Sequence, residues 1–444
     1  MKKEYTKINV GEVYLNDNRL SANHPIEKVA LPEFVSIPLF QHSGNPAIPI
    51  VEKDSFVKTG QLIAKADGRI SSNIHSSVTG RIIEIKEITE KKERHRKEIV
   101  IRTKDDVWEE NIDTTDTLIK EITLPVPEII NRIRDNGVVE LNGTAFPLHV
   151  KLSVQHKQKE NIIIINSAEN EAYISSDHRL MLEKGEELFI GTSILMKVYD
   201  TNKGIIAIEK EKKDVLKNML NISKQYPNIE IIALKKNVLY YNRQKLIKTL
   251  TGKNVPDNST DLPAGYLTHN IATTFAVYEA VQKNKPLIER IITVSDLDIK
   301  KGANLQVRIG TPLTPIFEKV CSVDINKKRI INGNVIRGKE ILELQTPINK
   351  KSIGLFTFSK RDTLFKCIRC SQCINACPMG LEPYRLAMHV RNSDFVLLRK
   401  EKILNCTNCG TCGYVCPTGR PVLDLIRYGR KKITEIQNNP QTEI

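Results

Sequence analysis

The sequence predicts a multidomain protein that combines α/β and β architecture. Three observations lead to this class: alternating apolar segments with turn residues near the start, strands alternating with amphipathic helices in the middle, and two cysteine-rich blocks near the end. A length of 444 residues, at about 150 residues per domain, suggests about three domains. We expect an N-terminal segment with a β domain, an α/β domain, a β-rich insert, a cysteine region and a polar tail, at residues 1–115, 116–285, 286–350, 351–430 and 431–444.

Short alternating segments occupy residues 31–102 and are separated by Gly- and Pro-containing turns. Residues 57–63 and 77–83 look like two halves of a small flattened barrel and resemble the barrel-sandwich domains of biotinyl and lipoyl carriers. Lys65 lies near a turn, but its flanks lack the tight exposed hairpin that a carrier lysine needs. We therefore predict a scaffold and a surface role for Lys65.

The pattern changes to alternating strands and helices after residue 124. Residues 127–136 have helical spacing and stop at Gly137. A layer of mostly parallel strands is expected from this alternation. Short strands then return near residues 290–294 and 305–310, which indicates the β-rich insert. The expected strands of the α/β layer are residues 161–166, 204–209 and 229–234, and its further helices are residues 213–225 and 273–283.

Eight of the nine cysteines stand in two blocks, each with the spacing C-x₂-C-x₂-C-x₃-C-P. This spacing is typical of [4Fe–4S] clusters, because one loop can wrap three corners of a cube while its amides remain free for the sulfides. A zinc ribbon is the alternative, but a zinc site does not need the third C-x₂-C step and the C-P. Disulfides are disfavoured in a reducing compartment.

The fourth cysteine of each block ligates the other cluster in two-cluster ferredoxins. On that pattern one set is Cys367, Cys370, Cys373 and Cys416, and the other is Cys406, Cys409, Cys412 and Cys377. The stretch 381–404 between the blocks has helical spacing, which predicts a helical ferredoxin. Cys321 stands alone, and we expect it to be a buried small apolar residue.

A loop with glycines, a proline and a lysine follows the first helix, from Gly137 through Gly143 to Lys151. Such a loop can contact a phosphate, although a plain surface loop has the same composition. Asn166, Glu169 and Glu171 follow a buried strand, where ligands of α/β sheets bind.

The net charge is +15, which fits a solvated lysine-rich surface, an anionic membrane face or an acidic protein partner. Nucleic acid is not expected as a partner, because one Trp and few Phe offer no stacking platform. No apolar run is long enough to span a bilayer, and no signal peptide is visible, so we expect a cytoplasmic protein.

Over nearly its whole length the chain resembles the C subunit of the Rnf electron-transport complex. Beside both cysteine blocks, the resemblance rests on residues 37–47, 175–181, 285–290 and 308–312, which match in the same order. It implies a barrel-sandwich hybrid, a flavin and NADH domain like the complex I flavoprotein, a β-grasp insert and a two-cluster ferredoxin.

The resemblance also implies an activity. Rnf complexes pass electrons between ferredoxin and NAD and couple this transfer to ion translocation. The C subunit is the peripheral, NAD-facing part on the cytoplasmic side of the inner membrane. Its implied cofactors are two [4Fe–4S] clusters and FMN, with NAD(H) as substrate. Its implied partners are integral-membrane subunits and a ferredoxin or iron–sulfur subunit.

The chain departs from the family pattern G-x-x-G-x-G-G-A-G-F-P-T in its glycine loop. It keeps Gly137, Gly143 and Lys151, together with the Phe-Pro pair, and Asn270 and Thr273 are retained in a second flavin-contact segment. Glycines in such loops allow positive φ and close backbone approach to a ligand. The chain has other residues where glycine or alanine is usual: Glu140, Asn142, Thr144 and Ala145.

Two versions of the nucleotide site therefore remain open: FMN in a modified pocket, or a degenerate site in a subunit that serves as an electron relay or adaptor. A cobalamin-reductase-like flavin and iron–sulfur protein is a further alternative. The barrel-sandwich domain that precedes the flavin domain favours the Rnf order.

Overall fold

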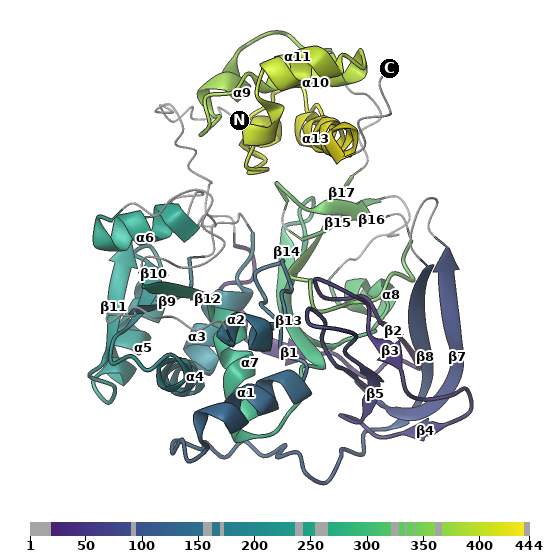
Figure 1. Ribbon diagram of the computed structural model, residues 1–444, viewed down its shortest axis with the longest axis vertical. Helices are drawn as coiled ribbons and strands as arrows, with labels where there is room; N and C mark the ends of the chain where they lie inside the picture. The colour runs from purple at the N-terminus through teal and green to yellow at the C-terminus, as the bar shows by residue number, and fades with distance from the viewer. Residues whose placement is uncertain are drawn as a thin grey trace.

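The computed structural model describes residues 19–89, 95–153, 162–168, 173–235, 243–253, 265–320, 328–333, 335–341, 343–359 and 366–438. A broad body holds three sheet-containing units, and a small helical unit stands above it (Figure 1). Each unit has its own buried apolar core. The multidomain α/β and β class is therefore confirmed.

The N-terminal β unit consists of two sheets around one aliphatic core, which includes Ile37, Ile63 and Ile99. The larger sheet has the order β2-β8-β7-β4 and the smaller has the order β3-β5-β6. Both predicted barrel halves contribute strands to these sheets. The strands are β2 (Phe34–Pro38), β3 (Ile48–Pro49), β4 (Phe56–Val57), β5 (Leu62–Lys65), β6 (Ile74–His75), β7 (Thr79–Thr89) and β8 (His95–Asp105).

The α/β unit is built on a parallel sheet in the order β11-β10-β9-β12. Successive side chains of a strand point to opposite faces of the sheet. Alternate residues of the inner strand β9 are therefore buried in different apolar cores. Ile163 and Ile165 face the core shared with α1, α4 and α7, and Ile164 faces the core shared with α6. The strands are β9 (Ile162–Asn166), β10 (Gly204–Glu209), β11 (Ile229–Leu234) and β12 (Tyr266–Asn270).

The helices of this unit agree closely with the sequence pattern, since the predicted helices appear as α1, α5 and α7. Pro127 lies in the first turn of α1, where its missing N–H costs nothing. The side chain of Asn270 caps α7 by accepting from the Ala272 N–H. The helices are α1 (Val126–Asp135), α2 (Leu148–Leu152), α3 (Ser176–Glu183), α4 (Gly185–Val198), α5 (Lys213–Ser223), α6 (Arg243–Thr251) and α7 (Ile271–Gln282).

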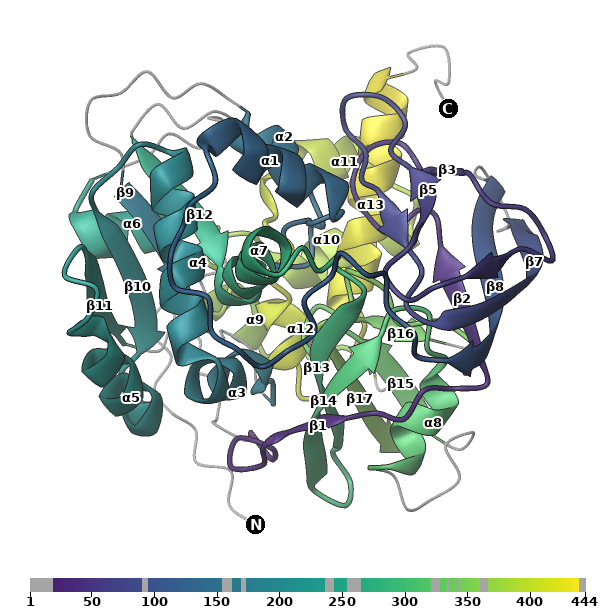
Figure 2. The same ribbon diagram turned by 90° about the horizontal axis from the view of Figure 1, so that it is seen from below.

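The third unit is a six-stranded mixed sheet in the order β1-β14-β13-β17-β15-β16. It reaches beyond residues 286–350, because β1 pairs parallel with β14 and β17 pairs parallel with β13. Figure 2 shows β1 along the edge of this sheet. The elements are β1 (Ile26–Lys28), β13 (Glu289–Asp296), β14 (Lys301–Arg308), α8 (Leu313–Glu318), β15 (Lys328–Asn332), β16 (Lys339–Ile341) and β17 (Gly354–Ser359).

The cysteine module is helical, as predicted, and α10 and α13 form its largest contact. The stretch between the blocks forms two helices, α10 and α11, and a 3₁₀ turn. Ser393, between α10 and α11, has φ 55°, which interrupts the helix there. Cys321 lies outside the described residues. The elements are α9 (Gln372–Asn375), α10 (Pro383–Arg391), α11 (Phe395–Lys400), η3 (Ile403–Asn405), α12 (Thr411–Tyr414) and α13 (Val422–Asn438).

Candidate cofactor sites

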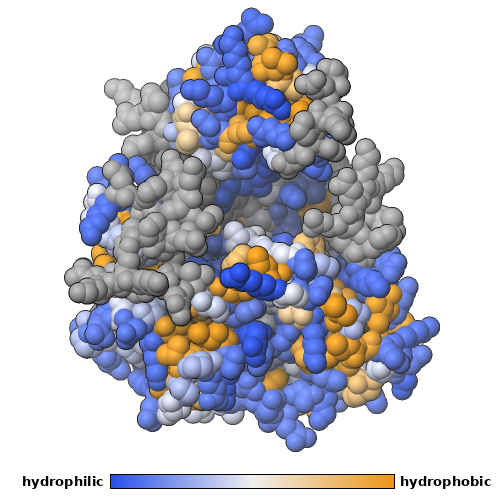
Figure 3. Space-filling model, viewed as in Figure 1, coloured by the Kyte–Doolittle hydropathy of each residue, from blue (hydrophilic) through white to orange (hydrophobic). Residues whose placement is uncertain are grey.

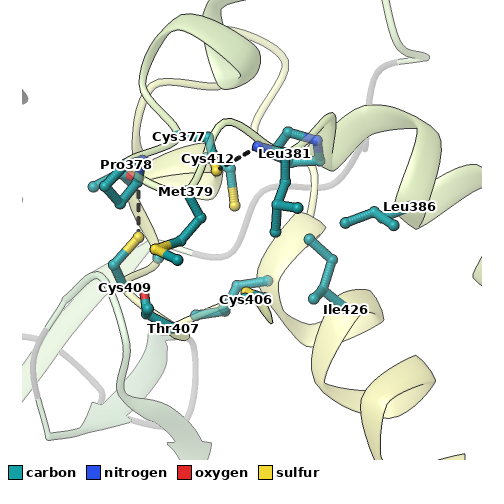
Figure 4. Close-up of a pocket in the computed structure, with 14 residues that line it drawn as sticks. Cys377, Pro378, Met379, Leu381, Leu386, Cys406, Thr407, Cys409, Cys412 and Ile426 are labelled. Carbon is teal, nitrogen blue, oxygen red and sulfur yellow. Dashed lines mark hydrogen bonds between the residues drawn. The ribbon is translucent and has the colours of Figure 1, made fainter. Parts of the chain in front are cut away.

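The cysteines of the module line two separate pockets. Figure 4 shows the members of one set around a common space that Met379, Leu386 and Ile426 help to enclose. These are the two sets that the ferredoxin pattern groups, with the fourth cysteine exchanged between blocks. One pocket is lined by Cys377, Cys406, Cys409 and Cys412, and the other by Cys367, Cys370, Cys373 and Cys416.

The two blocks have matching backbones, which explains how each wraps a space. Positive φ at Arg369 and Ser371 in the first block is matched at Asn408 and Gly410 in the second. A single-turn helix follows each pair, α9 in one block and α12 in the other. These left-handed turns let three cysteines per block face the same side.

The sulfur atoms accept hydrogen bonds from nearby groups. The Leu381 N–H donates to Cys377 Sγ at 3.4 Å, and the Asn408 N–H donates to Cys406 Sγ at 3.4 Å. The Thr411 hydroxyl lies 3.2 Å from Cys409 Sγ. Hydrogen bonds to cluster sulfurs are one of the means by which a protein sets the reduction potential.

In each set the four cysteines line a pocket. Tetrahedral zinc would require four sulfurs at about 2.3 Å from one centre. Among the residues with described placement, no three cysteine, histidine, aspartate or glutamate side chains come together to hold a single ion. The preference for a cubic cluster over zinc rests on the spacing of the two cysteine blocks.

The pockets differ in exposure. Cys367 and Cys370 are exposed at the rim of what we call the exposed cysteine pocket, whereas Cys377, Cys409 and Cys412 are buried in the other, the buried cysteine pocket. Burial raises the pKa of the Cys412 thiol. Iron takes thiolate ligands, so bound iron would hold this sulfur in its anionic form.

The second cysteine block is also the one that contacts the body. A Cβ at Gly410 would meet the Ile336 carbonyl oxygen at 2.8 Å, so the two backbones are in close approach. Arg427 on α13 donates to the Arg337 carbonyl at 2.8 Å. The second block thus packs on the segment between β15 and β16, while the rim of the exposed cysteine pocket faces solvent.

Four of the predicted flavin residues lie around one end of the parallel sheet: Lys151, Asn166, Asn270 and Thr273. The strand order reverses between β9 and β12, and ligands of such sheets bind outside the carboxyl ends of the strands at this switch point. Asn166 and Asn270 end these two strands and are register partners. The Asn270 amide also donates to Asp177 Oδ2 at 3.2 Å, a partner that sequence reasoning missed.

Lys151 and Thr273 are brought together by a third residue. Glu140 Oε1 accepts from Lys151 Nζ at 2.5 Å, and its Oε2 accepts from the Thr273 hydroxyl at 3.2 Å. His269 Nδ1 lies 2.8 Å from Glu140 Oε1. The sequence offered one signal for His269, its place directly before Asn270.

The predicted glycines lie apart from this cluster. The Gly137 carbonyl accepts from Lys350 Nζ at 2.6 Å and from the Ser72 hydroxyl at 3.1 Å. Gly137 therefore anchors the loop to the N-terminal β unit, and Lys350 is a buried residue that sequence reasoning missed. Gly143 has φ 90° near Ile353. Glu169 and Glu171 lie outside the described residues.

Ala145 shows what the altered loop retains. Its φ is 49°, in the left-handed region that favours glycine, although the residue is a buried alanine. The Ser43 N–H donates to its carbonyl at 3.0 Å, so the loop packs on a segment of the N-terminal β unit. The loop therefore has a left-handed backbone at this position although the residue is not glycine.

The groups at the switch point are of the types that bind a flavin phosphate: the Lys151 ammonium, the Thr273 hydroxyl and the N-terminal turn of α7. Lys151, however, is already paired with the Glu140 carboxylate. The eight cysteines fit two [4Fe–4S] clusters without such a departure.

Three families match the chain in order. Residues 9–106 match the RnfC barrel sandwich hybrid domain, residues 133–279 match the Nuo51 FMN-binding domain, and residues 366–420 match the 4Fe–4S dicluster domain. The chain thus carries an FMN-binding domain and a two-cluster domain.

Similar proteins include the C subunit of the proton-translocating ferredoxin:NAD(+) oxidoreductase complex of Clostridium ljungdahlii. It is 34% identical over 85% of this chain and 83% of its own length. The C subunit of the ion-translocating oxidoreductase complex of Rhodobacter capsulatus is 33% identical over 94% of this chain and 82% of its own. The C subunit of the Na(+)-translocating ferredoxin:NAD(+) oxidoreductase complex of Acetobacterium woodii is 28% identical over 80% and 81%.

Among solved structures, a chain of the NAD+-reducing [NiFe]-hydrogenase in its air-oxidized state superposes with a TM-score of 0.51. The match has 17% identity and covers 70% of this chain and 62% of the hydrogenase chain, so it supports the fold alone. The identity with the three C subunits is higher and extends over most of both chains. The chain therefore belongs to the RnfC family, the C subunits of the Rnf-type ion-translocating ferredoxin:NAD(+) oxidoreductase complexes.

Proposed function

We propose that this chain is the subunit that passes electrons between NAD(H) and a ferredoxin-type partner within an Rnf-type complex, in which the transfer is coupled to ion translocation. The observation that carries the proposal is the presence, in one chain, of an FMN-binding domain and two four-cysteine pockets. FMN supplies the exchange between two-electron hydride chemistry and single electrons, and the clusters carry single electrons.

The ligand assignment follows the two pockets. Cys377, Cys406, Cys409 and Cys412 would hold the cluster nearer the body, and Cys367, Cys370, Cys373 and Cys416 would hold the cluster at the rim. The exchanged fourth cysteines keep the two clusters close. The switch-point residues, with Lys151, Asn270 and Thr273, would hold FMN.

A partner is expected to dock beside the exposed cysteine pocket. Arg369 and Arg420 line that pocket, and Lys366 lies exposed next to Cys367. Positive charge there favours an acidic electron-transfer protein and speeds its encounter. The sequence-level charge of +15 has the same sign.

Association with integral-membrane subunits is proposed at exposed apolar side chains. Figure 3 shows apolar residues gathered over the cysteine module at the top and over the barrel at the right. Within the described part of the chain, no helix is both long and apolar enough to span a bilayer. We place the protein peripherally, on the cytoplasmic side of the inner membrane. The exposed apolar residues include Phe34, Ile48 and Phe56 in the barrel, and Ile368, Val396 and Tyr428 in the module.

The test is anaerobic reconstitution of the full chain with iron, sulfide and FMN, followed by addition of NADH. The visible absorbance of the clusters is expected to bleach only when FMN is present. Failure to bleach in protein that contains both clusters and FMN would contradict the NADH-linked role. A membrane wash at low and high salt tests attachment, because salt screens surface attraction.

A further inference from the structure

The loop from Gly137 to Lys151, which we call the flavin-type loop, contains a buried carboxylate. This carboxylate belongs to Glu140, at a position where the family pattern has glycine. Glu140 is 2% exposed, and every described partner of its carboxylate is a donor. Lys151 Nζ and His269 Nδ1 share its Oε1 at 2.5 and 2.8 Å, and the Thr273 hydroxyl donates to its Oε2 at 3.2 Å. This is the donor set that an anionic ligand group would require.

The electrostatics favour a permanently charged Glu140. Burial by itself raises the pKa of Glu140, but Lys151 and His269 hold it well below its usual range. Burial lowers the pKa of His269, so the imidazole is neutral at pH 7 and donates through Nδ1. The cluster therefore contains one anion and one cation, and the charge of Lys151 is balanced within the chain.

The Glu140 carboxylate lies at the N-terminus of α7, beside the switch point of the sheet, where an anionic ligand group would be expected to bind. Thr273 lies in the first turn of α7, and the N-terminus of a helix favours negative charge. Lys151 also donates to the Thr268 carbonyl on β12, which fixes its ammonium beside the switch point. The Leu141 N–H donates to the Thr273 hydroxyl at 2.8 Å, so the loop backbone is tied to α7 at the same place.

We propose that Glu140 is an internal counter-ion that occupies the phosphate position of the flavin domain, so that FMN must displace its carboxylate from Lys151 in order to bind. The proposal deepens the proposed function, since it rests on FMN as the ligand of this domain. In this chain phosphate recognition is weakened, and the loop keeps its fold when no flavin is bound.

The test compares FMN with riboflavin, which lacks the phosphate, on the full chain with both clusters assembled. Binding is followed by quenching of flavin fluorescence. In the unmodified protein the two flavins are expected to bind with dissociation constants within about threefold of each other. In E140G, FMN is expected to bind at least about tenfold more tightly, which corresponds to 1.4 kcal/mol, with riboflavin unchanged.

Two further variants keep the result interpretable. E140Q preserves the shape of the side chain without its charge, and it carries the same comparison if E140G does not fold. The double variant E140G/K151M removes the lysine and is expected to lose the gain for FMN. A gain of equal size for both flavins would show that Glu140 acts by bulk alone, and would overturn the proposal.

The proposal is also overturned if the unmodified protein already prefers FMN over riboflavin by tenfold or more and the variants do not change that ratio. The readout is binding without NADH, so it stays informative if NADH-driven cluster reduction fails. Conversely, normal cluster reduction with an unchanged FMN to riboflavin ratio would reject the counter-ion and leave the electron-transfer role in place.

Discussion

The cysteine module and the flavin-type loop belong to one chain, yet they relate to their family patterns differently. The module keeps all eight cysteines, and they line two pockets, four to each. The loop keeps its lysine but pairs it with Glu140 from the same loop. A site whose ligands remain free for a cofactor can be recognised from the motif alone, whereas a site that carries its own counter-ion cannot.

A second difference lies within the cysteine module. The buried cysteine pocket belongs mainly to the block that packs on the body, and the exposed cysteine pocket opens to solvent. The buried pocket therefore lies on the side of the module that contacts the segment between β15 and β16. The exposed pocket is the one beside which we propose that a partner docks.

The largest effect is expected for loss of a buried ligand. Cys412→Ser should remove one of the two clusters, because a hydroxyl is a poor replacement for a buried thiolate. Iron bound per chain should fall from about eight to about four atoms, measured on anaerobically purified protein. Cys321→Ser, outside both blocks, is the matched control and should keep about eight. Full iron content in Cys412→Ser would refute the assigned ligand set.

Exposure should set the order in which the clusters are lost. Cys416→Ser leaves only the cluster of the buried pocket, and Cys412→Ser leaves only the cluster of the exposed pocket. On admission of air, the visible absorbance of Cys412→Ser should decay several-fold faster, because oxidant reaches the rim at Cys367 and Cys370 directly. Equal decay rates would remove the distinction between the two pockets.

A smaller effect is expected at His42, a buried residue of the N-terminal β unit that directly precedes Ser43. Burial and the nearby Lys350 lower the pKa of His42 to about 4 from 6.5. Its folded-state pKa is depressed, so the unfolded chain binds more protons below pH 6.5 and stability falls on acidification. Through His42, the free energy of unfolding is expected to fall by about 2 kcal/mol between pH 7 and pH 5.

The measurement is urea unfolding at both pH values, followed by the fluorescence of Trp108, the single tryptophan of the chain. His42→Gln should lose about 2 kcal/mol less than the unmodified protein over this range. His24→Gln, at an exposed position, is the control and should match the unmodified protein. An identical pH dependence in all three proteins would show that His42 does not titrate on unfolding.

Much of the fold could be predicted because its signals are local. The spacing of apolar residues located α1, α5 and α7 to within two residues at either end, and buried runs located β9, β10 and β11. The extent of the six-stranded sheet could not be predicted. Its outer strand β1 pairs with β14, and its inner strand β17 pairs with β13, in each case with a strand far away in the sequence. The spacing of apolar residues within a strand does not indicate which distant strand it pairs with.

The sequence by itself determined the two cluster motifs, the family and the departure at Glu140. Cluster ligands lie a few residues apart, so their spacing is a property of the chain. Only the tertiary structure decided what Glu140 does. His269 and Thr273 stand far along the sequence and reach Glu140 through the end of β12 and the first turn of α7. In the sequence Glu140 is only a departure from a glycine position, whereas in the folded chain its carboxylate is the partner of Lys151.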